Sequence, residues 1–229
     1  MRVDFLELTS RLERVYSSRL ALRALSLSDA WPLFDATRNP GFNQFLMWPQ
    51  PEDAAAVLRR IDIISSAARQ GRLAAMSAVV KRTGEWVSLY RFQPHAMDPS
   101  LIEMGLWTHD RFWRGRYSLE LTRACVGAAF RLSNIPVLLA AAAPENLGSC
   151  RVLRSVGMRP VRMVTRLTET GSEATLQEFE ITRHEWASGA DREGSFDIFN
   201  PDLPPFTGAW NGPQREADSP AGLAQSESA

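Results

Sequence analysis

Three arginines around a single glycine form the segment of this chain best suited to bind a phosphate. Arg111, Arg114, Gly115 and Arg116 follow a segment with strand-like alternation and precede a helically spaced segment that begins at Ser118. A basic loop at a helix N-terminus offers an anion backbone N–H groups and the positive end of the helix dipole. A solvated charged turn is the usual alternative for such a run. The position between a strand and a helix start favours phosphate binding.

The cysteines and histidines form no catalytic or metal-binding pattern. His95, His109 and His184 are isolated in the sequence, so Cys150 has no evident partner that would make it a nucleophile. A small apolar helix residue is the expected role of Cys150. The isolation of the histidines also argues against a metal site. Two cysteines, of which Cys125 lies on an apolar helix stripe, are too few for a disulfide scaffold.

The hydrophobic patterns predict an α+β fold with the arginine loop near its centre. Alternating apolar residues predict strands over residues 19–24, 73–81, 86–92, 101–108, 137–142, 162–168 and 175–182. Helical spacing predicts helices over residues 1–16, from 26 onwards, 51–71, 118–132 and 146–156, with an aromatic-rich loop at 39–49. Gly157 is expected to end the last of these helices in a left-handed conformation. After the N-terminal helix, the order β-α-α-β-β-β-α-β-α-β-β predicts a mixed, mostly antiparallel central sheet flanked by helices.

Composition sets limits on the class of protein. The 229 residues carry 26 basic and 26 acidic side chains, and this zero net charge argues against a nucleic-acid or anionic-membrane binder. The longest apolar run, residues 137–143, is too short to span a membrane, and the N-terminus lacks a signal-peptide pattern. We therefore expect a cytoplasmic protein. Proline, glycine and acidic residues dominate from about residue 187, which predicts a partly disordered tail (188–229). We expect one domain (18–187) before it and an N-terminal helical extension (1–17).

Four short motifs, in this order and spacing, resemble those of the GNAT acyltransferase superfamily. They are Leu-Ala-Leu-Arg-Ala-Leu at residues 20–25, Glu-Met-Gly-Leu-Trp at 103–107, Pro-Glu-Asn-Leu-Gly-Ser at 144–149 with Val-Gly-Met at 156–158, and Thr-Arg-His-Glu-Trp at 182–186. The resemblance covers about residues 19–186. It is strongest to the subfamily that acetylates α-amino groups of ribosomal proteins and to its antibiotic-modifying relatives.

The resemblance implies roles for individual residues. Glu103 on the central strand becomes the candidate general base, although a solvated strand glutamate is the alternative. Ser149 becomes the candidate group that assists the leaving thiolate, with an ordinary first-turn serine as the alternative. Asn146 matches the asparagine that binds the pantetheine arm, and it is also a natural N-cap. The resemblance further implies that acyl-CoA is held by Trp107, Thr108 and the loop residues Arg111, Arg114, Gly115, Arg116, Tyr117 and Ser118.

One element departs from the family pattern. The family loop has the form Gln/Arg-x-x-Gly-x-Gly/Ala, and here Arg114 and Arg116 stand at the two small-residue positions. Glycine at such positions permits close backbone approach and unusual φ angles. The two arginines can instead clamp the pyrophosphate with their side chains, or they can block it.

The expected reaction is transfer of an acyl group, most simply acetyl, from acyl-CoA to a primary amine in a ternary complex. An α-amine with a pKa near 8 is neutral in about one molecule in ten at pH 7, whereas a lysine amine is neutral in roughly one in 2,500. Phe42, Phe45 and Trp48 lie where the family builds its acceptor pocket and favour a peptide or an apolar acceptor. Two rival functions are a tailoring enzyme that moves a longer acyl chain and a non-catalytic binding protein of the same fold. A monomer and a homodimer are both compatible with the sequence.

Overall fold

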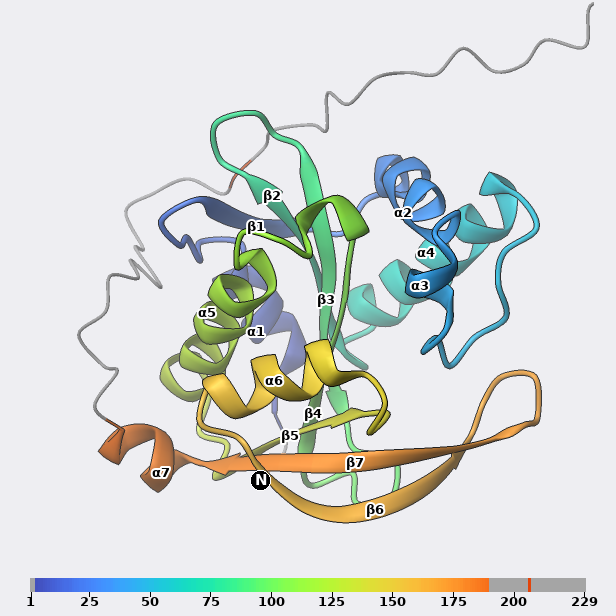
Figure 1. Cartoon of the computed structure of the whole chain (residues 1–229). Coiled ribbons are helices and arrows are strands. Elements are labelled where there is room, and N and C mark those ends of the chain that lie inside the picture. The colour runs from blue at the N-terminus through green and yellow to red at the C-terminus, as the bar shows by residue number, and fades with distance from the viewer. Residues whose placement is uncertain (1–2, 190–205, 207–229) are drawn as a thin grey trace, which may run out of the picture.

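Seven strands form one sheet in the order β1-β2-β3-β4-β5-β7-β6 (Figure 1). The computed structural model describes residues 3–189 and residue 206. The strands are β1 (Leu20–Ala24), β2 (Ala74–Val80), β3 (Trp86–Pro94), β4 (Ile102–Thr108), β5 (Val137–Ala142), β6 (Arg159–Leu167) and β7 (Glu173–Thr182). Every pairing is antiparallel except that of β4 with β5. This arrangement confirms the predicted mixed, mostly antiparallel sheet.

Helices cover both faces of the sheet. They are α1 (Phe5–Leu12), α2 (Ala30–Thr37), α3 (Pro40–Asn43), α4 (Ala54–Arg69), α5 (Tyr117–Leu132), α6 (Leu147–Ser155) and α7 (Arg183–Ser188), with short 3-10 turns η1 (Leu27–Asp29) and η2 (Asp110–Phe112). The larger core cluster joins α1, α5 and α6 to one face of the sheet. The smaller cluster joins α2 and α4 to the other face. The central strands are therefore buried on both sides.

The N-terminal segment packs into the larger core instead of standing apart from it. Phe5, Leu8 and Leu12 are at most 6% exposed and belong to the same cluster as the sheet. Burial of an apolar side chain of this size contributes about 1.5–3 kcal/mol. The helix predicted for residues 1–16 is thus shorter, and it is part of the fold.

Local sequence explains most helix ends and the places where the prediction differs. The long helix α4 begins at Ala54 and not at Pro51, because the Asp53 side chain accepts a hydrogen bond from the Ala56 N–H and caps it there. A short helix, α3, occupies part of the aromatic-rich loop, with Asn39 as its N-cap. Gly157 has φ 89°, which confirms the left-handed helix end.

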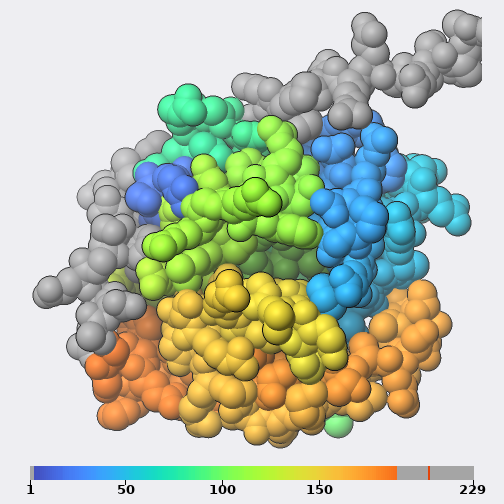
Figure 2. Space-filling model, in the orientation of Figure 1, coloured from blue at the N-terminus to red at the C-terminus, as the bar shows by residue number. Residues whose placement is uncertain are grey.

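The two central strands separate at the middle of the sheet. β4 pairs with β5 only from Ile102 to Met104, although β4 continues to Thr108 and stays paired with β3 over that whole length. The residues of β4 beyond Met104 therefore face a gap on the β5 side. The space-filling view shows a hollow between the α5 and α6 segments on this face (Figure 2).

Two predictions are not tested by these elements. The tail predicted from residue 188 lies almost entirely outside the described residues. The boundary at residues 17–18 also remains a prediction. Within the described residues, none of the helices has the length and apolar character needed to cross a bilayer.

Candidate active site

Glu103 lies near the start of β4, with its side chain on the sheet face covered by α2 and α4. It shares that face with Trp107, which packs against the smaller core cluster. Glu103 is 8% exposed, so it is not a solvated strand glutamate. Arg166 Nη1 donates to Glu103 Oε1 at 2.8 Å, and the buried Oε2 has no hydrogen-bond partner among the described residues. The ring nitrogen His95 Nε2 lies 3.9 Å from Oε2. One carboxylate oxygen is therefore held by a hydrogen bond, and the other accepts none.

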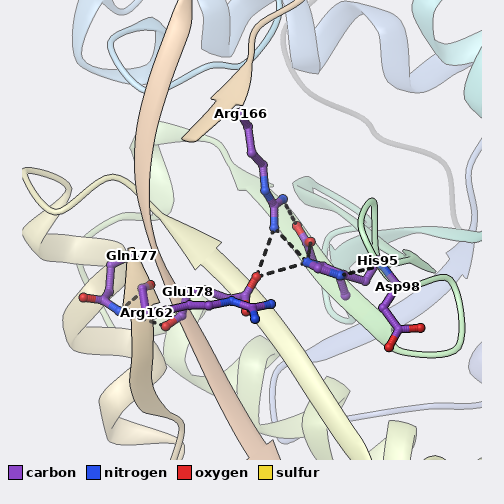
Figure 3. A network of polar contacts seen from close by, with 7 residues as sticks. His95, Asp98, Arg162, Arg166, Gln177 and Glu178 are labelled. Atoms are coloured by element: carbon purple, nitrogen blue, oxygen red, sulfur yellow. Dashed lines mark hydrogen bonds and ion pairs between the residues drawn. The ribbon is translucent and has the colours of Figure 1, made fainter. Parts of the chain in front are cut away.

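Arg166 belongs to a buried charge network that three strands build around Glu103. β7 supplies Glu178, which is 1% exposed, and His95 follows β3 and is 2% exposed. His95 Nε2 lies 3.0 Å from Glu178 Oε2, and Arg166 Nη2 lies 3.5 Å from the same oxygen. Arg162 contacts the other oxygen of Glu178 at 2.9 Å. Figure 3 shows Arg166, Arg162 and His95 converging on this carboxylate.

The hydrogen bonds of His95 define its tautomer. The Asp98 backbone N–H donates to His95 Nδ1 at 3.3 Å, so in the neutral ring the proton is on Nε2, which donates to Glu178. The network brings two carboxylates, Glu103 and Glu178, together with two guanidinium groups, of which Arg162 is exposed and Arg166 is largely buried. Sequence reasoning missed this network because it joins distant parts of the chain: His95 and Arg166, for example, are 71 positions apart.

Two tryptophans and two arginines form the adjoining wall on the same face. The Trp48 and Trp107 ring centroids are 5.6 Å apart. The Arg60 guanidinium lies 4.3 Å from the centre of the Trp48 ring, and the Arg91 guanidinium lies 5.2 Å from that of Trp107. These distances suit cation–π contacts. The wall is therefore amphipathic, with aromatic rings covered by positive charge.

The β6–β7 hairpin reaches across to the segment before α4 and borders this wall (Figure 1). At its turn, the Glu169 N–H donates to the Met47 carbonyl at 2.9 Å. The Glu169 carboxylate also accepts from Arg60 Nη1 at 2.9 Å. The hairpin thus connects the charge network around Glu103 with the loop that carries Trp48.

The backbone that faces the β4–β5 gap is that of Leu106. The His109 N–H donates to the Val87 carbonyl of β3, and backbone groups alternate in direction along a strand, so Trp107 also faces β3. Leu106 and Thr108 face the gap, but the Thr108 carbonyl accepts the indole N–H of Trp113 at 2.9 Å. The register therefore places the Leu106 backbone and the Thr108 N–H toward the gap, while Trp107 faces β3. The role of the backbone around Trp107 and Thr108 in holding the pantetheine stays a prediction.

The arginine loop adopts a conformation that normally requires glycine. Gly115 has φ 86° and Arg116 has φ 64°, and Arg116 is the only described residue other than glycine with a positive φ. A left-handed conformation costs a side-chain-bearing residue about 1–2 kcal/mol. Arg116 stands at the second small-residue position of the family loop, so the chain keeps the turn and replaces the glycine at an energetic cost.

Glu120 in the first turn of α5 offsets part of that cost by tying the loop to β1. Its carboxylate accepts hydrogen bonds from Ser17 Oγ at 2.5 Å, Ser18 Oγ at 3.0 Å, and Arg19 N and Nε at 2.8 and 2.6 Å. Arg19 Nη2 donates in turn to the Gly115 carbonyl at 2.9 Å. Burial disfavours the charged form of Glu120, but these hydrogen bonds outweigh burial and its pKa is lowered. The loop is thereby held in place.

The loop arginines divide into one structural residue and two free cations. Arg111 forms an ion pair with Glu85 of the β2–β3 turn at 2.9 Å. Arg114 and Arg116 are exposed, and within the part of the chain that the structure describes their side chains make no hydrogen bond or ion pair. They are available to an anion at the α5 N-terminus. Tyr117 is engaged by Arg19, whose guanidinium lies 3.9 Å from the ring centre, and Ser118 Oγ bonds to Thr108 Oγ1.

Helix α6 borders the gap with its N-terminus. Asn146 caps it, because its Oδ1 accepts the Ser149 N–H at 3.1 Å. The Ser149 hydroxyl is partly exposed and has no protein hydrogen-bond partner among the described residues. Cys150 is buried, and burial raises the pKa of its thiol, so it is a poor nucleophile at neutral pH.

The three aromatic residues predicted to bind substrate have different surroundings. Phe42 is 7% exposed and packs in the smaller core cluster with α2 and α4. Phe45 is partly exposed. Trp48 is 6% exposed, and its indole Nε1 is buried without a hydrogen-bond partner among the described residues. Only Trp48 is thus placed in the wall beside Glu103.

Known proteins share this fold and parts of this sequence. Residues 19–159 match the family described as acetyltransferase (GNAT) domain. The chain is 23% identical over 148 residues to an uncharacterized N-acetyltransferase p20 of Bacillus licheniformis, covering 65% of this chain and 83% of the relative. The structure of Mycobacterium smegmatis RimJ in complex with CoA-disulfide superposes with a TM-score of 0.60 at 18% identity, over 76% of this chain and 90% of that one. The ribosomal-protein-S5-alanine acetyltransferase of Vibrio fischeri gives 0.61 at 12% identity, over 75% and 97%.

The family match covers more than half of the chain, and the separated central strands and seven-stranded sheet agree with it. The chain therefore belongs to the acetyltransferase (GNAT) family, as the sequence motifs predicted. The family is one of N-acetyltransferase enzymes that transfer acetyl groups from acetyl-CoA. At these identities, the two solved structures show a shared fold and leave the substrate of this chain open.

Proposed function

We propose that this protein transfers an acetyl group from acetyl-CoA directly to a primary amine of a peptide, protein or small molecule. The observation that carries this proposal is the buried carboxylate of Glu103. Arg166 holds one of its oxygens, and the other has no partner among the described residues. A fixed carboxylate with a free, buried oxygen on the central strand is suited to remove a proton from an amine.

Three features support acyl-CoA as the acyl donor. The backbone of Leu106 faces the gap where β4 and β5 separate, and it can pair with pantetheine amides as an added strand would. Arg114 and Arg116, together with the N-terminus of α5, are suited to hold the pyrophosphate. Asn146 lies across the gap at the start of α6, where its amide nitrogen can donate to the pantetheine arm. We therefore favour pyrophosphate binding by the side chains of Arg114 and Arg116 over obstruction of the pyrophosphate site by them.

The residues around Glu103 and Ser149 suit a balanced transfer. The amine nitrogen attacks the thioester carbonyl carbon, a C–N bond forms, and the carbonyl electron pair moves to oxygen. A proton of the resulting ammonium passes to Glu103 Oε2, directly or through water. The electron pair on oxygen then re-forms the C=O bond as the C–S bond breaks with its electron pair on sulfur, and the Ser149 hydroxyl donates a hydrogen bond to the thiolate. Thiols have pKa values near 8.5, so the thiolate needs only a modest donor before it takes a proton from solvent.

The solved relatives named above make a peptide α-amine a reasonable first acceptor. An α-amine is neutral in about one molecule in ten at pH 7, so a single carboxylate base suffices for it. Since acetyl-CoA is the proposed donor, a cytoplasmic location remains our expectation.

Release of free CoA thiol from acetyl-CoA, measured across a panel of peptides and small amines, tests this proposal. We expect amine-dependent release together with an acetylated product of the matching mass. Calorimetric titration with acetyl-CoA separates the rival functions. Binding without turnover on any amine would favour a non-catalytic binding protein, and preference for a longer acyl-CoA would favour a tailoring enzyme.

A further inference from the structure

Arg91 lies beside the Glu103 carboxylate and is a cation without an ionic partner among the described residues. It projects from β3 opposite Gly105 of β4, on the same sheet face as Glu103. Its guanidinium lies over the Trp107 ring and is partly buried. Among the residues that the structure describes, Arg91 forms no ion pair and no side-chain hydrogen bond. A desolvated guanidinium without an anion is energetically unfavourable.

The other cations around the site are matched, which leaves Arg91 as the surplus charge. Arg60 pairs with Glu169, Arg166 pairs with Glu103, and Arg162 pairs with Glu178. Burial lowers the pKa of Arg91, while nearby Glu103 raises it and Arg60 lowers it. The wall beside Glu103 therefore carries one unbalanced positive charge.

The same wall contains a second donor without a partner. Trp48, which contacts Trp107, has its indole Nε1 buried with no hydrogen-bond acceptor in the described part of the chain. Native proteins satisfy nearly all buried polar groups, so this orphan donor adds an unsatisfied polar group to the wall that also carries the unpaired Arg91. Glu103 Oε2, also orphaned, is the matching acceptor for the amine.

We propose that the acceptor amine carries a carboxylate, which binds Arg91 while the amine meets Glu103. This inference rests on the proposed acetyl transfer and names the substrate class for it. Glu103 lies opposite Gln93, so Arg91 is its diagonal neighbour across the strands, with Cβ atoms about 7–8 Å apart. The carboxylate is therefore several bonds from the amine, as in a peptide with an acidic residue after its N-terminal residue.

The Arg91 side chain lies against Gly105 of the opposite strand. A Cβ atom added to Gly105 would lie 3.5 Å from Arg91 Nε and 3.8 Å from its Cγ. At these distances a Cβ would make an ordinary van der Waals contact, so the Arg91 stem packs closely on β4 on its way to Trp107. Arginine is also suited to the task, since its planar fork binds carboxylates with two hydrogen bonds.

Matched acceptor pairs test the proposal. Acetylation kinetics would be measured on Ala-Asp-Ala amide against Ala-Asn-Ala amide, which differ only in the carboxylate, and on alanine against alaninamide. We expect kcat/KM of the wild type to favour the Asp peptide about 10- to 100-fold over the Asn peptide, mainly through KM. A preference confined to alanine over alaninamide would contradict the proposal, because an α-carboxylate lies too close to its amine to reach Arg91 while the amine meets Glu103. Only the preference for the Asp peptide supports Arg91 as the anchor, once the variants below agree.

Substitutions at two stacked arginines separate recognition from structure. Arg91→Met keeps the stem over Trp107 and should reduce the Asp/Asn ratio to near one, whereas Arg91→Lys should retain part of it. Arg60→Met is the matched control, because Arg60 stacks on the other tryptophan but is already paired. It should affect both peptides by the same factor. An unchanged ratio in Arg91→Met would overturn the proposal.

Binding measurements distinguish failure of this inference from failure of the proposed function. Calorimetric titration of the two peptides into the protein with CoA present reports the preference without turnover. If the peptides are acetylated equally by the wild type, the substrate class is wrong and acetyl transfer stands. If the Asp peptide binds more tightly but no acceptor is acetylated, Arg91 is an anion anchor in a protein that lacks the proposed activity.

Discussion

The guanidinium of Arg166 donates from Nη1 to Glu103 Oε1 at 2.8 Å, and it joins the β6–β7 hairpin to the central strand of the sheet. The same side chain lies 3.5 Å from Glu178 in β7. Arg166 therefore neutralises two buried carboxylates and orients the one that we assign as the base. Because the pair is largely buried, its removal affects both stability and activity.

Arg166→Met should destabilise the protein by about 3 kcal/mol, since it leaves Glu103 and Glu178 without their shared cation. Chemical denaturation followed by circular dichroism measures this change. Arg166→Lys keeps the positive charge without the two donor groups of the guanidinium, and it should lose less stability than Arg166→Met. A Met variant as stable as the wild type would show that the ion pair contributes nothing measurable to the fold.

The arginine loop allows backbone and charge to be tested separately at one position. Arg116→Gly and Arg116→Ala both remove the guanidinium, but only glycine adopts φ 64° without strain. We expect the Gly variant to be about 1 kcal/mol more stable than the Ala variant. Equal unfolding free energies for the two variants would contradict the left-handed conformation of this residue.

Both Arg116 variants and Arg114→Ala should weaken acetyl-CoA binding, because these exposed arginines are free to meet the pyrophosphate. We expect losses of about 3- to 10-fold each at low ionic strength, with a smaller loss at high salt. Calorimetric titration provides the affinities. Arg111→Ala is a useful comparison, because Arg111 is already paired with Glu85. Affinities unaffected by Arg114→Ala and by both Arg116 variants would mean that the anion binds elsewhere.

Glu120 predicts a pH dependence of stability. Its pKa in the folded protein is lowered from an ordinary value of 4.5, since hydrogen bonds from Ser17, Arg19 and Ser18 outweigh the opposing effect of burial. A group with a lowered folded pKa stabilises the protein above its unfolded pKa and loses that contribution as pH falls through the folded value. Thermal melts of the wild type should therefore drop below about pH 4.5, and Glu120→Gln should melt lower at pH 7 with a shallower decline in acid. Parallel melting curves for the two proteins would refute this.

The sequence predicted the elements of the fold more fully than it predicted the site. Strand alternation and helical spacing are local, and they located all seven strands and the helix after the arginine loop. Gly157 also predicted the end of α6, because few residues other than glycine adopt φ 89°. The resemblance directed attention to Glu103, Ser149 and the loop. Their catalytic and binding roles remain predictions.

The partners of these residues could not be predicted, because they depend on sheet order. β7 lies between β5 and β6, and only this placement brings Glu178 and Arg166 beside Glu103. Which backbone groups of β4 face the gap depends on the strand register, which hydrophobic alternation does not determine. Arg91 also gave no signal in the sequence, since an isolated strand arginine is usually a solvated side chain.

Replacement of Glu103 by glutamine tests the central claim most directly. Gln keeps the hydrogen bond from Arg166 through its amide oxygen but cannot take a proton from the amine. Rates of acetyl-CoA-dependent peptide acetylation should fall by about 100-fold in kcat, while the affinity for acetyl-CoA stays close to that of the wild type. The melting temperature should fall because the ion pair with Arg166 is lost, so the rates are compared at a temperature where both proteins are folded. If the glutamine variant acetylates at the wild-type rate across pH 6–9, Glu103 is not the base and the proposed mechanism is wrong.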